Sequence, residues 1–81
     1  IGMPDVAVEI KSPDDTYTAM RAKAAYLERG CRMVLLVYPE KRIVEVYQPD
    51  ADIQILQIDD VIDGGAVLPG FRLPLRELFK A

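Results

Sequence analysis

The chain lacks histidine and tryptophan and has a single cysteine, Cys31, among its 81 residues. Without histidine, triads that need an imidazole base are excluded, and a zinc site is disfavoured because zinc usually takes Cys or His ligands. One thiol cannot form an internal disulfide, and it suits a reducing, cytoplasmic setting. A site of hard oxygen ligands remains open, because Asp and Glu together number 13.

Long apolar runs are absent as well: none reaches the ~18 residues of a membrane span, and the N-terminus has no signal-peptide pattern. We therefore expect no membrane partner. Half of the residues (51%) are nonetheless hydrophobic and 28% are charged, which favours a folded domain over a disordered tail. A chain this short, starting at Ile1, predicts a single domain over residues 1–81 that is part of a larger one, or that joins a partner such as a second copy.

Positive charge is scarce. Lys and Arg number 10, the net charge is −3 and the isoelectric point is about 4.8. Proteins that bind DNA by bulk electrostatic attraction are basic. Any nucleic-acid role must therefore depend on a local patch or on a metal ion.

Hydrophobic periodicity predicts an α/β domain in the order strand, helix, three strands and short helix. The helical crossover favours parallel pairing of the first two strands, and the next hairpin is antiparallel, so the sheet should be mixed. The expected strands are residues 4–11, 33–38, 42–48 and 53–58, the expected helices are residues 16–29 and 74–80, and residues 67–71 should be extended.

The expected helix over residues 16–29 has clear ends. Asp14, Asp15 or Thr16 can cap its N-terminus, and Gly30 stands where a helix commonly stops. Cys31 falls on the apolar stripe of this helix, so we expect it to be buried.

Glu9 and Lys11 are the first candidate site residues. Two strand residues spaced by two lie on one face, ~6.6 Å apart along the strand, so a carboxylate and an ammonium can address one site. The carboxylate can bind Mg²⁺, and the lysine can orient a water or hold a phosphate, which suits phosphodiester hydrolysis. The alternative is a surface ion pair on a half-exposed strand.

The second metal ligand is not evident within the chain. Asp5 shares a face with Glu9 but lies ~13 Å away along an extended strand, too far for one ion. Asp59, Asp60 and Asp63 lack the ligand spacing of an EF-hand loop and are interpreted as turn formers. Lys23 lies beside the apolar stripe of the helix and either reaches over the sheet toward a site or is a solvated helix lysine.

Two segments resemble a known family. Residues 4–13, PDVAVEIKSP, resemble the signature strand of the Uma-type "putative restriction endonuclease" family, a branch of the PD-(D/E)XK nuclease-like superfamily. The most specific match is the tail over residues 63–75, DGGAVLPGFRLPL. The similarity covers nearly the whole chain. It implies a restriction-endonuclease-like α/β fold and Mg²⁺- or Mn²⁺-dependent cleavage of DNA.

The resemblance also implies roles for three residues. Glu9 would be the metal ligand, Lys11 the catalytic lysine and Lys23 an auxiliary helix lysine. Family members are typically about twice this length, so the chain looks like a C-terminal half whose second metal ligand lies outside it. The competing hypothesis is a non-catalytic interaction or oligomerisation module on the same scaffold.

Overall fold

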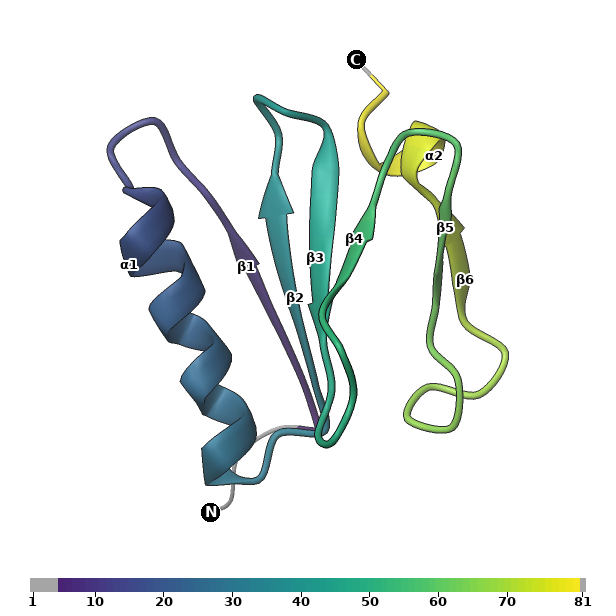
Figure 1. Ribbon diagram of the computed structural model, residues 1–81. Coiled ribbons are helices and arrows are strands. Elements are labelled where there is room, and N and C mark those ends of the chain that lie inside the picture. Colours follow the sequence, from purple (N-terminus) through teal and green to yellow (C-terminus); the bar gives the residue numbers. More distant parts are fainter. Residues whose placement is uncertain (1–4, 81) are drawn as a thin grey trace.

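The computed structural model describes residues 5–80, and its centre is a four-stranded sheet (Figure 1). Strand β1 (Val6–Ile10) lies at one edge and runs parallel to β2 (Met33–Tyr38). Strand β3 (Ile43–Tyr47) pairs antiparallel with β2 and with β4 (Gln54–Leu56). The mixed sheet, the parallel first pair and the antiparallel hairpin that the sequence predicts are therefore confirmed.

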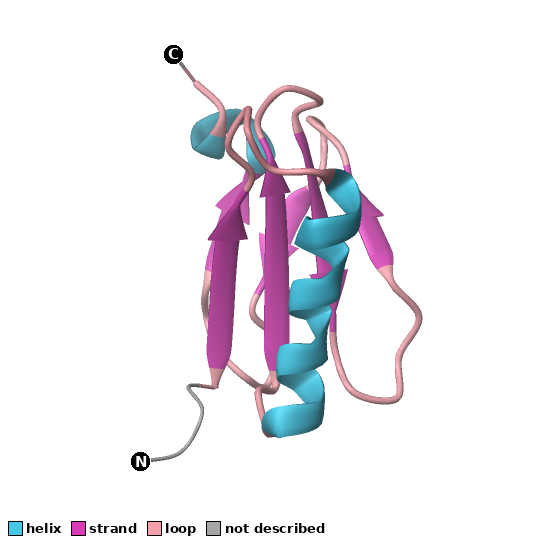
Figure 2. Ribbon diagram, turned by 90° about the vertical axis from the view of Figure 1, so that its left-hand side faces the viewer, coloured by secondary structure: helices cyan, strands magenta, loops and turns pink. Residues whose placement is uncertain are grey.

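The helical crossover packs on one face of this sheet (Figure 2). Helix α1 (Tyr17–Ala22) continues directly as a 3-10 helix, η1 (Lys23–Arg29), so the expected single helix changes its geometry halfway. The Thr16 hydroxyl oxygen accepts a hydrogen bond from the Ala19 amide (3.0 Å) and caps the first turn. Gly30 ends the crossover with φ of 103°, a left-handed conformation that favours glycine.

Asp15 is not the cap. Its carboxylate instead accepts hydrogen bonds from the Ser12 amide (2.9 Å) and the Ser12 hydroxyl (3.0 Å). These two bonds lower the pKa of Asp15 and fix the turn between β1 and α1. Thr16, the third of the possible caps, is the N-cap, because it is the residue immediately before the first helical turn.

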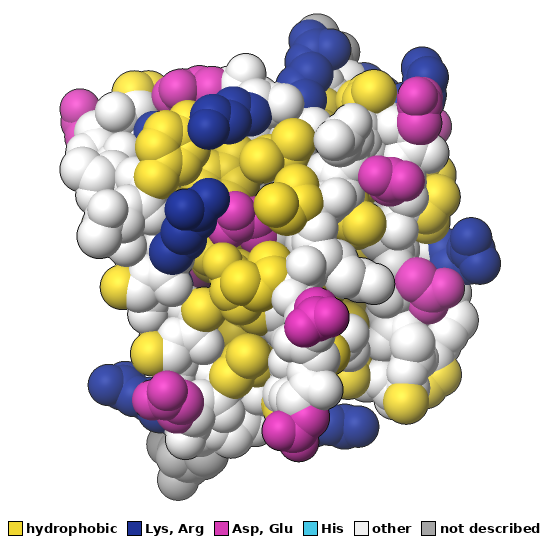
Figure 3. Space-filling view, viewed as in Figure 1, with side chains coloured by type: hydrophobic (Ala, Val, Ile, Leu, Met, Phe, Trp, Pro, Cys, Tyr) yellow, Lys and Arg dark blue, Asp and Glu magenta, His cyan; other side chains and the backbone are white. Residues whose placement is uncertain are grey.

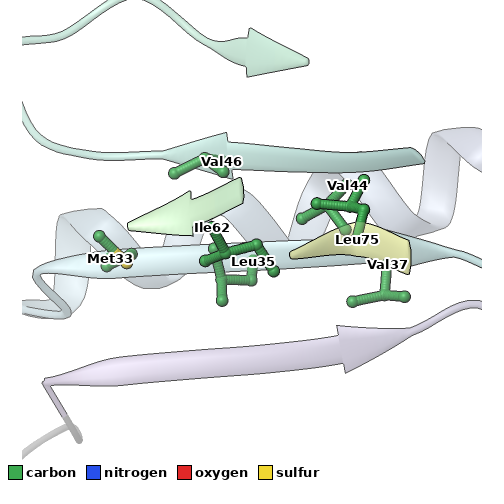
Figure 4. Close-up of a cluster of buried hydrophobic side chains, with 7 residues drawn as sticks. All are labelled: Met33, Leu35, Val37, Val44, Val46, Ile62 and Leu75. Carbon is green, nitrogen blue, oxygen red and sulfur yellow. The ribbon is translucent and has the colours of Figure 1, made fainter. Parts of the chain in front are cut away.

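Two hydrophobic clusters cover the two faces of β2, and every residue of that strand is buried. The cluster under the helices includes Cys31, which is 1% exposed as the sequence predicts. The opposite cluster lies between the sheet and the C-terminal segment (Figure 4). Its buried members are Met33, Leu35, Val37, Val44, Val46, Ile62 and Leu75.

The C-terminal part departs most from expectation. The expected strand over residues 53–58 is reduced to β4, because residues 57–60 turn back through a hydrogen bond from the Gln57 amide to the Asp60 carboxylate (2.7 Å). A two-stranded antiparallel sheet follows, formed by β5 (Val61–Asp63) and β6 (Arg72–Pro74).

The segment between β5 and β6 is a turn, so the expected extended conformation over residues 67–71 is wrong. The amides of Val67 and Leu68 both donate to the Gly64 carbonyl (3.1 and 3.0 Å), which coils the chain. A side chain at Gly64 would collide with the backbone of Leu68. Helix α2 (Leu75–Leu78) then follows with Pro74 just before its first turn, shorter than the expected 74–80.

Within residues 5–80, no helix has the length and apolar character that crossing a membrane requires.

Candidate active site

The side of β1 that carries Glu9 and Lys11 faces the helical layer. Ala7, on the same side, packs against the cluster under the helices. The Lys11 amide donates to the Val37 carbonyl (2.9 Å), so the ladder extends one residue beyond β1 and keeps Lys11 in phase with Glu9. Figure 2 shows the helices lying away from the edge strand, and on this side of β1 Ala7 and Glu9 are only partly buried.

Lys23, rather than Lys11, contacts Glu9. The Lys23 ammonium nitrogen lies 2.9 Å from Glu9 Oε1, and both side chains are 31% exposed. The hydrogen bond that the Lys23 ammonium donates to Glu9 raises the pKa of Lys23. The sequence left two alternatives open for Lys23. In the structure its side chain reaches over the sheet instead of pointing into solvent.

Lys11 has other partners. Its ammonium donates to the Ser12 carbonyl (3.2 Å), lies 3.6 Å from Glu40 Oε1 and sits 4.9 Å from the centre of the Tyr17 ring. The residue is only 8% exposed. The structure thus places Glu9 and Lys11 on one side of the strand, as expected, but pairs each with a different group.

Glu45 is a buried carboxylate that the sequence analysis missed. It is 2% exposed and accepts hydrogen bonds from the Tyr38 hydroxyl (2.8 Å), the Tyr47 hydroxyl (3.1 Å) and Arg21 Nη2 (3.1 Å). Burial raises the pKa of Glu45. The three hydrogen bonds together lower it by more than burial raises it, so the pKa of Glu45 lies below its usual value. Alternation along β3 was the available signal, because it puts Glu45 on the same side as Ile43 and Tyr47.

Arg21 is the basic partner of this buried carboxylate. Its side chain is 62% exposed, yet its guanidinium reaches the buried carboxylate, which raises the pKa of Arg21. The pKa values of Tyr38 and Tyr47 are raised as well, mainly by burial and secondly by the hydrogen bonds that their hydroxyls donate to Glu45. The four groups form a closed structural network beside the Glu9 and Lys23 pair.

The other acidic residues do not assemble a metal site. Among residues 5–80, no three His, Cys, Asp or Glu side chains are grouped so that they could hold an ion. Asp60 and Asp63 bond to backbone amides in turns, at Gln57 and Gly65, and Asp59 pairs with Arg76. Their interpretation as turn residues agrees with these contacts, and Glu9 remains the candidate ligand.

Comparison with known proteins assigns the family. A family model described as "Uma2: Putative restriction endonuclease" matches residues 1–76. The chain belongs to this family. Among solved structures, it is similar to a protein from Anabaena variabilis described as a putative nuclease belonging to DUF820, with a TM-score of 0.86 and 26% sequence identity. The similarity confirms the nuclease-like α/β fold.

The match covers 98% of this chain but 45% of the Anabaena chain, so the chain spans less than half the length of that relative. The search of curated proteins found no match. The family and the fold are thereby assigned. A fold does not by itself define an activity, so the chemistry of this Uma2 chain depends on its own residues.

Proposed function

We propose that this chain carries part of the active site of a metal-dependent DNA endonuclease. The observation that supports this most is the environment of Glu9. Its carboxylate projects from the edge strand, is partly exposed, and has one ion-pair partner among the described residues, the Lys23 ammonium at 2.9 Å. A carboxylate with unused lone pairs beside one lysine, with a second lysine on the same side of the strand, supplies part of what hydrolysis of a phosphodiester needs.

The donor chemistry of Glu9 fits a hard divalent cation. Mg²⁺ and Mn²⁺ prefer carboxylate oxygens and usually retain several waters, so one exposed carboxylate is a suitable first ligand. One carboxylate does not complete a site, and we propose that the second comes from outside this chain, as the length of the Anabaena relative allows. When bound, the cation would polarise the phosphate and supply an activated water.

The two lysines would have different tasks. Lys11 lies one strand repeat beyond Glu9, and its ammonium would orient the attacking water and offset the negative charge that develops on the phosphate. Lys23 holds Glu9 Oε1 in the arrangement seen here. It must release that oxygen when a cation takes it, and would then be free to donate to the phosphate.

A plasmid-cleavage assay on the full-length natural protein with Mg²⁺ or Mn²⁺ tests the proposal. We expect Glu9→Ala to lower the cleavage rate about a thousandfold and Lys11→Ala about a hundredfold, since each removes a charge that stabilises the transition state. Glu28→Ala is the matched control, because Glu28 is an exposed acid in η1 that forms no ion pair with a described residue. Cleavage by Glu9→Ala and Lys11→Ala at the wild-type rate would show that the mechanism is wrong.

A second candidate function is supported by the opposite side of β1. Val8 and Ile10 are 52% and 61% exposed on a strand that, among the described residues, forms the edge of the sheet. An exposed apolar edge strand is typical of an assembly surface. A non-catalytic oligomerisation module would form a stable oligomer in light scattering and would bind no divalent metal in titration calorimetry.

A further inference from the structure

The β2–β3 turn, residues 39–42, stands at the end of the sheet where Lys11 follows β1. Parallel pairing of β1 with β2 brings the ends of both strands together, so the turn and Lys11 are neighbours. Glu40 of the turn lies 3.6 Å from the Lys11 ammonium. Figure 3 shows basic side chains, with acidic ones among them, over this upper end of the molecule, where Figure 1 places the turn.

Tyr17 joins two ammonium groups there. Lys11 Nζ lies 4.9 Å from the ring centre and Lys41 Nζ lies 4.2 Å from it. Both contacts are cation–π interactions, which draw the two like charges toward one aromatic ring. The ring itself is supported by Tyr38, whose ring centre lies 5.5 Å away. The position of Lys41 is therefore set by packing, although the residue is exposed.

Acidic groups offset the charge of Lys11, which faces Glu40 and also acts on the Asp15 carboxylate, but those that the structure describes form no ion pair with the basic residues of the turn. Glu40 is the one carboxylate in ion-pair contact with Lys11 among residues 5–80, and its side chain is 57% exposed. Neither Lys41 nor the adjacent Arg42 forms an ion pair with a described residue. Lys41 and Arg42 are thus two exposed cations without an ion-pair partner among residues 5–80, and such cations can neutralise the charges of a phosphate backbone even on a chain of net charge −3.

We propose that Lys41, held on Tyr17 beside Lys11, binds a DNA backbone phosphate next to the one that is cleaved. The inference rests on the proposed function, since it places the scissile phosphate at Glu9 and Lys11. An ammonium on a flexible stem contacts phosphate oxygens without reading bases. The contact therefore positions DNA along the end of the sheet independently of its sequence, and Arg42 extends the same basic edge.

The test measures binding of the full-length natural protein to a fluorescent DNA duplex by anisotropy, in EDTA so that no cleavage occurs, across a salt series. We expect Lys41→Ala to reduce the magnitude of the slope of log K against log salt by about 0.9, the value for one lost phosphate contact. Lys41→Arg should keep the slope. Arg32→Ala, which removes the same charge before β2 at the other end of that strand, is the matched control and should also keep it.

A parallel cleavage assay with Mg²⁺ separates the two proposals. We expect Lys41→Ala to raise KM while leaving kcat nearly unchanged, because the contact lies beside the reacting phosphate. An unchanged salt slope in Lys41→Ala, an equal loss in Arg32→Ala, or no DNA binding by the wild type overturns the inference. A reduced slope in Lys41→Ala, with no metal supporting cleavage by the wild type, supports the phosphate site and overturns the nuclease proposal.

Discussion

Glu9 and Glu45 occupy one row of the sheet, with Leu36 between them, and each receives a basic side chain from the helical layer. Lys23 reaches Glu9, and Arg21 reaches Glu45. The two acids differ in what surrounds them. Glu45 is 2% exposed and has three donors, whereas the Glu9 side chain is 31% exposed and has one ion-pair partner among the described residues.

The difference separates a structural carboxylate from one that is available for chemistry. A buried carboxylate must have its lone pairs satisfied, and Glu45 meets this requirement with two tyrosine hydroxyls and a guanidinium. Three of its roughly four acceptor positions are thereby occupied, and burial keeps the remaining one away from a hydrated metal ion. Glu9 retains unused lone pairs and access to solvent, so a cation can displace its single lysine at modest cost.

The largest expected effect is on stability, where the two acids should differ most. Glu45→Ala should lower the free energy of unfolding by about 3 kcal/mol, because it leaves buried tyrosine hydroxyls and a guanidinium without their acceptor. Glu9→Ala should leave that free energy nearly unchanged, since partly exposed ion pairs contribute little. Urea denaturation followed by circular dichroism measures both values, and equal losses would mean that the two acids are structurally equivalent.

A smaller effect should appear in acid. The pKa of Glu45 is lower in the folded chain than its ordinary value of 4.5. The stability it contributes is therefore fully present above about pH 4.5 and is lost as the pH falls through the folded pKa. Urea midpoints measured between pH 3 and pH 7 should fall less steeply on the acid side in Glu45→Gln than in the wild type. Some slope should remain from Asp15, whose pKa is also lowered.

The smallest expected effect concerns metal affinity. If Lys23 occupies the oxygen that a cation needs, Lys23→Met should strengthen Mn²⁺ binding about two- to fivefold, the factor expected for removing a weak, partly exposed competitor. Arg21→Met is the matched control, because Arg21 pairs with Glu45, whose carboxylate is buried and not available to the ion. Titration calorimetry on the full-length natural protein gives both affinities, and weaker binding by Lys23→Met would mean that the lysine supports the cation site.

Much of the fold could be predicted because its signals are local. The continuous apolar run of β2 predicts a strand buried on both faces, and Gly30 and Thr16 mark the ends of the crossover. The segment after β4 could not be predicted as well. Its turn depends on amides that converge on the Gly64 carbonyl, and its two short strands are defined by pairing with each other. Such pairings leave little trace in three residues of sequence.

The candidate site divides in the same way. Alternation puts Glu9 and Lys11 on one side of a strand, and that placement is correct because the period of a strand is a local property. The contacts of the two residues were not predictable from spacing. Lys23 meets Glu9 and Tyr17 meets Lys11 because the crossover lays the helix over the sheet, which brings together residues that are 14 and 6 positions apart in the chain.

The sequence by itself determined the order of the elements, the mixed sheet and the position of an acid and a lysine on its edge strand, because backbone periodicity and turn residues act over a few positions. Only the tertiary structure decided which carboxylate stays free. Glu9 and Glu45 are chemically identical residues in alternating strands, and their difference arises from the side chains that packing brings to each: a single lysine for Glu9, and Arg21, Tyr38 and Tyr47 for Glu45.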